Sequence, residues 1–450
     1  MPHAISLTDG TTTVNLYNLA GAFPTSWRLA AGEEGDETVG EALDLLIQGA
    51  SVTALQAAVR DIEKLLEAAV RRERTRVGAR VFLQVKWDGE ADTWRSEVVG
   101  GRLELHGAAE QYGRLKIEAS LGLTRRAWWE GPEAQLPLSN GNGTNNTAGL
   151  DLFNCNDGSG SSPNKRHNYA QIAAADVVGS LPAPVKVELA NSTGLTMFLT
   201  NIHLANNVFS DPESLGHMLE AESRVWGGTV TADAACSGGS KVVFSSYAGQ
   251  AQIYWSLNAA VLQKTAGRWF RLLLAVRSRT ATALETVQAE LRDPTDAVVL
   301  HSGPEVALNR PATLGYPLVD MGAFPLPPGP SSTAYERVRL WLTFRVAEGT
   351  ATTAIDYIQL TPTDSYRPLR LQPIGILAND VLVDDGIEGL SYATANGFRG
   401  PFLRGKGDPL LVWPGRTQRI YVQADDDGFP PSITDRWKMR AWYRPRRKSL

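Results

Sequence analysis

A polar run divides this chain into parts that look incomplete on their own. Residues 139–147 read Ser-Asn-Gly-Asn-Gly-Thr-Asn-Asn-Thr, with nothing apolar to bury, which favours a linker over an element of structure. Residues 1–135 have the pattern of an α+β unit, and residues 366–450 have the pattern of strands alone. Whole domains are tolerated as insertions at exposed loops whose ends lie close together. We therefore expect the two flanks to form one body around an inserted domain.

Length, charge and hydropathy exclude several classes of protein. A chain of 450 residues is expected to form two or three domains. The net charge of −4 argues against a dedicated nucleic-acid binder, and no apolar stretch approaches the roughly 20 residues that span a bilayer. The first residues lack the pattern of a secretory signal, so synthesis in the cytoplasm without secretion or membrane insertion is expected.

One stretch of the chain has clear helical periodicity. Apolar residues at steps of three and four between residues 51 and 74 form a single stripe, which consists of Val52, Leu55, Val59, Ile62, Leu66 and Ala69. Ser51 is a suitable N-cap, arginines occupy the last turn, and Gly78 is expected to end the helix.

The rest of the chain has the patterns of strands. Residues 81–87, 102–106 and 114–121 alternate or run apolar, which predicts a sheet with one helix packed on a face. Residues 176–365 carry short strands between Gly, Pro and Asn turns, as in an antiparallel sandwich. The predicted fold class is mainly β with one long helix: a discontinuous β-sandwich or α+β ring domain plus an inserted galactose-binding-like β-sandwich.

These patterns predict the domain boundaries. Residues 1–138 form the first part of the flanking domain, 139–175 a linker, 176–365 the inserted sandwich, and 366–450 the strands that complete the flanking domain. The basic run 444–448 is interpreted as a solvated terminus, with a contact to an acidic neighbour as the alternative.

The sequence offers no catalytic signature, so we expect no enzyme. No Gly-x-Ser-x-Gly, His-Glu-x-x-His or phosphate-loop motif occurs. None of the six histidines lies near another or near a carboxylate at metal-ligand spacing; they are His3, His106, His167, His203, His217 and His301. Cys155 and Cys236 are interpreted as two unpaired thiols, although one bridge remains possible.

Three acidic residues form the most suggestive constellation. Glu220 and Glu222 are alternate residues, so an extended strand projects them to one side. Asp356 on a neighbouring strand would complete a cluster of hard oxygen ligands suited to Ca²⁺. The alternative is three solvated acidic residues at sheet edges.

Residues 215–362 resemble β-sandwich carbohydrate-binding modules with a galactose-binding-like jelly roll. The resemblance rests on Glu220-Ala-Glu222, on the following turn Ser237-Gly-Gly-Ser240, and on Asp356 near the last strand. It implies a structural calcium held by Glu220, Glu222 and Asp356. It also implies sugar contacts through aromatic side chains in loops, for which the candidates are Trp226, Tyr247, Trp255 and Tyr335.

The flanks resemble the ring domain of siphophage distal tail proteins. The resemblance rests on a strand, a long amphipathic helix, alternating strands and Trp128-Trp129, and on the ending from Pro414-Gly415 to Trp442-Tyr-Arg-Pro-Arg446. It implies a virion protein of a long-tailed phage that joins the tail tube to the tip. The expected partners are copies of itself in a hexameric ring, the tube and hub proteins, and a host-surface glycan bound by several weak sites at once.

Two other functions remain open at this point. The chain is either a tail-tube or other virion structural protein whose sandwich is decorative, or a secreted carbohydrate-binding or polysaccharide-active protein. The missing secretory signal argues against the second of these.

Overall fold

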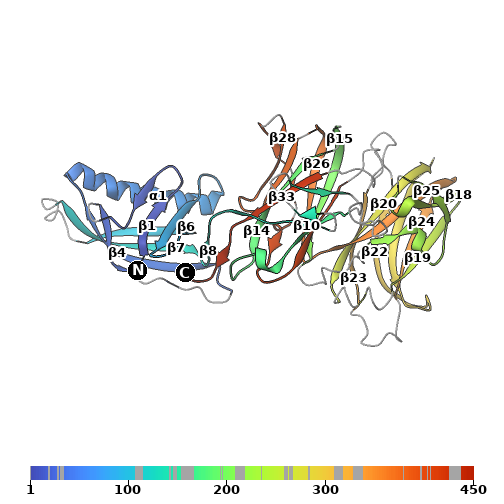
Figure 1. The fold of residues 1–450 in the computed structure, drawn as a ribbon, viewed down its shortest axis with the longest axis horizontal. Coiled ribbons are helices and arrows are strands. Elements are labelled where there is room, and N and C mark those ends of the chain that lie inside the picture. Colours follow the sequence, from blue (N-terminus) through green and yellow to red (C-terminus); the bar gives the residue numbers. More distant parts are fainter. Residues whose placement is uncertain are drawn as a thin grey trace. The chain divides into compact units, whose positions relative to one another are not determined.

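The protein is mainly β with one long helix, as the sequence predicts (Figure 1). Among the described residues, no helix is long and apolar enough to cross a membrane. The computed structural model describes residues 2–18, 21–27, 30, 35–106, 115–140, 143–144, 149–153, 167–192, 194, 196–207, 218–234, 236–257, 262, 267–281, 284–308, 318–327, 338–378, 380–395, 398–402, 404–405, 407–424 and 437–450.

The chain forms two compact units, each assembled from separate segments. Unit 1 consists of Met1–Ala134, Val178–Pro182 and Arg444–Leu450. Unit 2 consists of Gln135–Val177 and Ala183–Tyr443.

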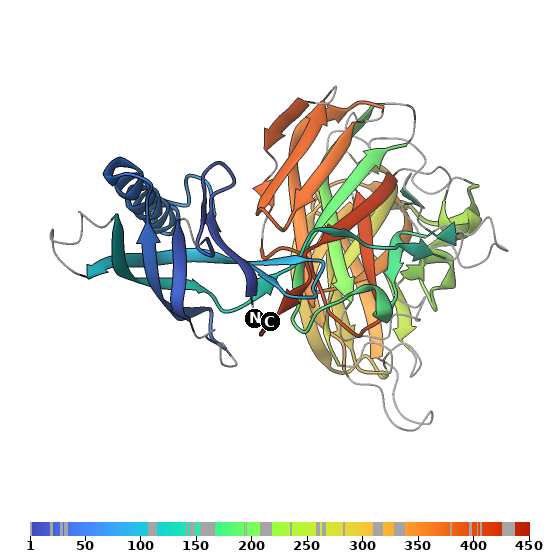
Figure 2. The same ribbon diagram turned by 60° about the vertical axis from the view of Figure 1, so that its left-hand side comes forward.

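Unit 1 is one antiparallel sheet with helix α1 across a face, seen in both ribbon views (Figures 1 and 2). The main path of the sheet runs β2-β1-β5-β6-β7-β4-β3, and β8 and β34 attach beside it. The elements are β1 Pro2–Thr8, β2 Thr13–Asn15, β3 Ala22–Trp27, β4 Thr38–Gln48, α1 Val52–Thr75, β5 Val81–Trp87, β6 Thr93–His106, β7 Lys116–Arg126, β8 Trp129–Glu130 and β34 Arg446–Arg447.

Helix α1 begins where its sequence predicts. The Ser51 hydroxyl accepts a hydrogen bond from the Ala54 amide at 3.1 Å, which caps the first turn. The apolar stripe is buried against the sheet through Leu55, Ile62 and Leu66, among others. The helix ends at Arg76, which has a left-handed φ of 57°, so the stop comes before the predicted Gly78.

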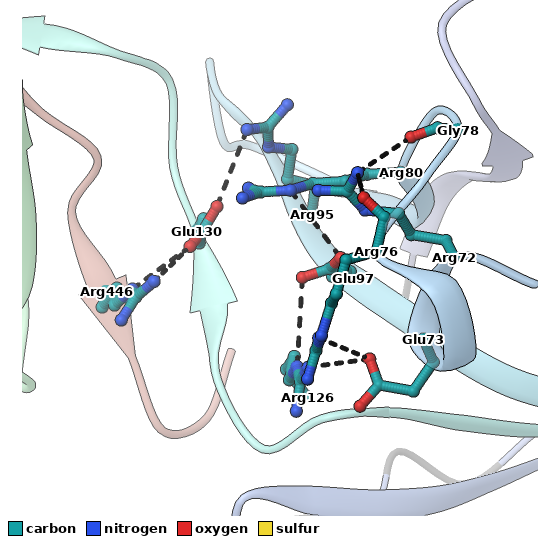
Figure 3. A network of polar contacts seen from close by, with 10 residues as sticks. All are labelled: Arg72, Glu73, Arg76, Gly78, Arg80, Arg95, Glu97, Arg126, Glu130 and Arg446. Atoms are coloured by element: carbon teal, nitrogen blue, oxygen red, sulfur yellow. Dashed lines mark hydrogen bonds and ion pairs between the residues drawn. The ribbon is translucent and has the colours of Figure 1, made fainter. Parts of the chain in front are cut away.

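The basic segment near residue 446 is part of unit 1 and is not a solvated terminus. Strand β34 pairs with β8, and the Arg446 guanidinium donates to the Glu130 carboxylate at 2.7 and 3.1 Å (Figure 3). Burial raises the pKa of Glu130, but Arg446 and Arg95 outweigh burial, so this pKa lies below its ordinary value. The interpretation as a solvated terminus was wrong, and the alternative, a contact with an acidic neighbour, is confirmed by Glu130 of β8.

The same network extends to the end of helix α1. Arg126 on β7 contacts Glu73 of α1 at 3.1 Å and Glu97 of β6 at 3.9 Å (Figure 3). Each of these groups is partly buried, so solvent screens the pairs only in part. The network therefore ties the helix, three strands of the sheet and the 444–450 segment together.

Unit 2 begins with two sheets built from both sides of the central region. One has the order β11-β10-β13-β32-β15-β26-β30, and the other runs β12-β33-β14-β27-β28-β29, with β31 and β9 attached. Their elements are β9 Ala134–Gln135, β10 Ser139–Asn140, β11 Gly143–Thr144, β12 Leu150–Leu152, β13 Tyr169–Ile172, η2 Ala174–Asp176, β14 Ala183–Asn191, β15 Met197–Asn207, β26 Ser365–Ile376, β27 Val381–Asp385, β28 Leu390–Ala395, β29 Phe398–Phe402, β30 Arg404–Gly405, β31 Leu411–Val412, β32 Gln418–Ala424 and β33 Trp437–Tyr443.

This pairing corrects the predicted boundaries. Residues 366–443 do not complete unit 1, because β32 and β26 pair with β15, and β33 pairs with β14. The predicted linker 139–175 contributes β10, β12 and β13 to the same sheets. Of the expected C-terminal flank, only Arg444–Leu450 joins unit 1.

The rest of unit 2 is a sandwich between residues 218 and 362, inside the expected insert. One sheet has the order β17-β18-β25-β20-β23 with β16 attached, and the other runs β19-β24-β21-β22. Phe244 and Phe344 meet between the sheets, with ring centroids 5.3 Å apart. The elements are β16 Met218–Glu220, η3 Ala221–Ser223, β17 Thr229–Ala232, η4 Ser237–Gly239, β18 Ser240–Tyr247, β19 Gln250–Leu257, β20 Trp269–Ala281, β21 Glu285–Arg292, β22 Val299–Ala307, β23 Leu318–Pro325, β24 Val338–Val346 and β25 Ala351–Pro362.

Candidate functional site

The three predicted acidic residues come together at one turn of this sandwich. Asp356 lies on β25 and is fully buried, and its carboxylate accepts the Ser237 amide at 3.0 and 3.2 Å. The Ser237 hydroxyl donates to Glu220 at 2.6 Å. Glu222 lies in the 3₁₀ turn η3, directly after the strand that carries Glu220, so the predicted placement of both residues on one extended strand was wrong. The turn 237–239 thus connects carboxylates from two parts of the chain.

Gly238 allows this close approach. It has a left-handed φ of 64°, and a Cβ added there would lie 2.1 Å from Glu222 Oε1 and 3.6 Å from the Glu220 carboxyl carbon. Any other residue at this position would displace the carboxyl groups.

Burial and crowding raise the pKa of Asp356 to about 8. Loss of water is the largest cause, and the charges of Glu220 and Glu222 add to it. The Ser237 amide and Arg277 oppose the rise. Clustered carboxylates are the donors that Ca²⁺ prefers, so the donor set fits this ion. Among the described residues, however, no three His, Cys, Asp or Glu side chains are already arranged around one point to hold a metal.

We call Glu220, Glu222, Asp356 and the turn 237–239 together the acidic turn. In the chain, Glu222 is followed by a loop that presents Trp226. This side chain is 54% exposed. The loop is held against β19 by two backbone hydrogen bonds, from Val225 N to Tyr254 O at 3.0 Å and from Tyr254 N to Trp226 O at 3.1 Å. These two bonds, both to Tyr254, hold the backbone of residues 225 and 226 against β19 before any ligand arrives.

Two glycines and an arginine shape the remainder of the loop. Gly227 and Gly228 have positive φ values of 106° and 62°. A Cβ at Gly227 would lie 2.2 Å from Gln252 O, so only glycine fits. The Arg224 guanidinium donates to the carbonyl groups of both glycines, at 2.8 Å for Gly228.

Aromatic neighbours support Trp226 from the face of the four-stranded sheet. The Trp226 and Trp341 rings have centroids 6.0 Å apart, and Trp341 stacks on Tyr254 at 4.5 Å. Trp341 is itself fixed, because its Nε1 donates to Asp296 at 2.7 Å and the Arg292 guanidinium lies 4.8 Å over its ring. Trp226 is therefore the exposed member of a packed aromatic group.

A groove of about 640 Å³ lies beside the exposed indole. Its lining combines two aromatic residues, two glutamines, one arginine and small or aliphatic residues: Arg224, Val225, Trp226, Gly227, Gly228, Phe244, Gln250, Ala251 and Gln252. An aromatic face with a few polar groups around it is the usual composition of a small-ligand site.

Two of the other predicted sugar contacts, Trp255 and Tyr247, do not line this groove. Trp255 is only 2% exposed, packs in the sandwich core and donates its Nε1 to Glu220 O at 2.8 Å, so its assignment as a sugar contact was wrong. Tyr247 is half-buried, and its hydroxyl donates a hydrogen bond to the carboxylate of the buried Glu285. Burial raises the pKa of Tyr247 above its ordinary range. Tyr335 lies outside the described residues.

Sequence reasoning missed Tyr254 and Trp341, although a signal was present. Residues 252–256 read Gln-Ile-Tyr-Trp-Ser, and alternation places Tyr254 on the face opposite to Ile253 and Trp255. The apolar pattern of β24 likewise gives one face to the core and the other to Trp341. If the two faces of each strand had been considered, Tyr254 would have been predicted as the surface aromatic residue in place of Trp255.

Comparison with models of known protein families and with curated proteins finds no match to this chain.

Proposed function

We propose that this protein is a structural virion component of a long-tailed phage tail tip, without enzymatic activity. Unit 1 assembles with copies of itself into a ring, and the 218–362 sandwich binds a glycan of the host surface. The observation that carries the binding part is the exposed, pre-positioned Trp226 beside a polar groove. An exposed indole that packing and backbone pairing hold in place has little to lose in conformational entropy when it binds a ligand.

The layout of unit 1 supports the assembly part of the proposal. Both ends of the chain lie together in this unit (Figures 1 and 2). Of the described residues between Ala134 and Arg444, those that belong to unit 1 are Val178–Pro182. A compact body that carries a long insertion suits a platform that displays a separate binding domain.

Trp226 supplies the physical basis of sugar binding. The apolar face of a sugar ring packs on an indole, and the polar lining of the groove is suited to hydroxyl groups. One such contact is weak, but several sites on one ring engage a polymer together and raise the overall affinity by orders of magnitude, about 10²–10⁴-fold.

A calcium ion would act on the same loop. Glu220, Glu222 and Asp356 are the residues that would hold it, and Trp226 follows Glu222 closely in the chain. The ion would neutralise the crowded carboxylates. The acidic turn would then keep the start of the Trp226 loop in one conformation.

Replacing Trp226 with alanine is expected to weaken binding to a responsive glycan on an array by at least about tenfold, because the exposed indole supplies the stacking face. The melting temperature should hardly change, since the side chain is largely in water. Trp269→Ala is a matched control, because Trp269 is 51% exposed on the other sheet. Equal losses in both variants, or a wild type that binds no glycan in calcium, would leave the sandwich decorative.

The purified protein is expected to form closed rings of about six subunits at high concentration, visible by electron microscopy. Antibodies raised against it should label the tail tip of the particle that carries it. A protein that stays monomeric at every concentration and labels no particle would instead support the secreted carbohydrate-binding alternative.

A further inference from the structure

Within the described part of the chain, strand β6 has an edge without a partner along half of its length. Its first part, Thr93–Val98, pairs with β5 on one side. Its second part pairs only with β7, through residues 98–106, and none of the described residues pairs with it on the opposite side. The backbone along residues 100–106 thus has no described strand beside it on one side.

Two neighbouring hollows lie between helix α1 and this part of β6, and we refer to them together as the groove. Two hollows of about 640 and 340 Å³ share Glu63 and follow α1 from Leu55 to Thr75. On the strand side the lining comes from Gly101, Arg102 and Leu103 of β6, and then from Leu105 of β6, which is 40% exposed, and Ile117 of β7. The apolar residues that α1 contributes to the lining are Leu55, Val59, Leu66 and Val70.

The other edges of the sheet carry the features that normally prevent strand addition. Edge strand β2 has only three residues, and edge strand β3 contains Pro24, which cannot donate a backbone hydrogen bond. The free part of β6 contains no proline and presents Leu103 and Leu105 beside the groove. The β6 edge is therefore the open position for an added strand.

Charge along the rim of the groove is uneven. Arg71 and Arg74 are exposed on the rim at the C-terminal half of α1, and neither forms an ion pair with a described residue. Glu63 and Glu67 line the middle, and a single exposed arginine, Arg60, lines the half toward the N-terminus of α1. Unpaired exposed guanidinium groups favour a partner that carries carboxylates at that end.

We propose that this groove binds an extended segment of another protein, which adds to the free edge of β6 as a strand. Alternate apolar side chains of the segment pack against α1, and its acidic end lies at Arg71 and Arg74. Main-chain hydrogen bonds supply affinity in this mode of recognition, and side-chain pockets supply selectivity. The inference concerns unit 1 and is independent of glycan binding by the sandwich.

The full-length protein is tested with a fluorescent synthetic peptide in which valine alternates with threonine and one end carries aspartates, made in both polarities. One polarity is expected to bind, and the amides of residues 100–106 should then exchange more slowly with deuterium. The same peptide with alternate N-methylated amides should bind at least about tenfold more weakly, because it cannot pair with β6. Equal binding of the methylated peptide would overturn strand addition.

Charge reversal tests the orientation. The double variant Arg71→Glu, Arg74→Glu is expected to bind the aspartate peptide at least about tenfold more weakly. It should bind a peptide that carries lysines in place of the aspartates more tightly. Lys64→Glu, at an exposed position of α1 outside the groove, is the matched control and should leave the affinity unchanged. Melting temperatures should stay close to wild type in all variants.

Two results would overturn the proposal. One is a failure of every peptide to bind at millimolar concentration while the amides of residues 100–106 exchange as in free protein. The other is self-association of the wild type that protects those amides and is lost in the Arg71→Glu, Arg74→Glu variant. The second result would assign the groove to a second copy of this chain.

Discussion

Replacing Arg125 with methionine is expected to lower the free energy of unfolding of unit 1 by about 3–5 kcal/mol. Arg125 and Glu41 form a fully buried pair, with Arg125 Nε 2.8 Å from Glu41 Oε1. The Glu41 carboxylate also accepts the Ala30 amide at 3.1 and 3.2 Å. Without the guanidinium, a carboxylate would remain buried without its countercharge.

The effect is best measured by hydrogen exchange of the β4 and β7 amides, because a chain of two units need not unfold in one step. The double variant Glu41→Gln, Arg125→Met is the control, and it should regain part of the loss because no charge is left buried. A loss below about 1 kcal/mol in the single variant would show that the carboxylate reaches water or takes up a proton at little cost.

In the presence of a chelator, unit 2 is expected to lose stability as the pH rises from about 4 to about 8. The pKa of Asp356 is about 8 in the folded protein against an ordinary value of 3.8. Between these values the folded state holds a proton that the unfolded state has released, so stability falls with rising pH. The slope for one group is at most about 1.4 kcal/mol per pH unit.

The comparison with Asp356→Asn isolates this contribution, since the variant should lack the slope while other groups titrate as before. A slope that is unchanged in the variant would assign the pH dependence to other residues. Melting curves across this pH range measure both proteins.

Calcium is expected to restore the stability that unit 2 loses as the pH rises to 8, because the ion stabilises the charged carboxylates. The melting temperature of the wild type should rise with added calcium, and Glu220→Gln with Glu222→Gln should remove the rise. Glu305→Gln, at an exposed position of the same sandwich, is the matched control and should keep it. If calcium shifts none of these proteins, the acidic turn binds no calcium.

Local patterns predicted the elements of this fold well, because period and capping depend on neighbours in sequence. Ser51 and the apolar stripe after it defined α1, and the predicted strand 81–87 is β5. The pairing of strands could not be derived in the same way. Strands β14 and β33 pair although more than half of the chain separates them in sequence. No local feature of either strand specifies the other as its partner.

The candidate site was predictable only in part, because some of its residues are close in sequence and others are brought together by strand pairing. The spacing of Glu220 and Glu222 brought the acidic turn to attention, and Asp356 does join it. Trp255 was misassigned because residue type was considered without the face of the strand. The support of Trp226 by Trp341 depends on the register between β19 and β24, which the sequence of neither strand contains.

The return of Arg444–Leu450 to unit 1 determines the order in which the newly made chain can reach its final form. The ribosome releases the strands and helix of unit 1 first, but β8 receives its partner β34 only after all of unit 2 has been synthesised. Until then Glu130 lacks the Arg446 guanidinium. Any product that stops within unit 2 therefore keeps an unfinished unit 1, so assembly through this unit would discriminate against truncated chains.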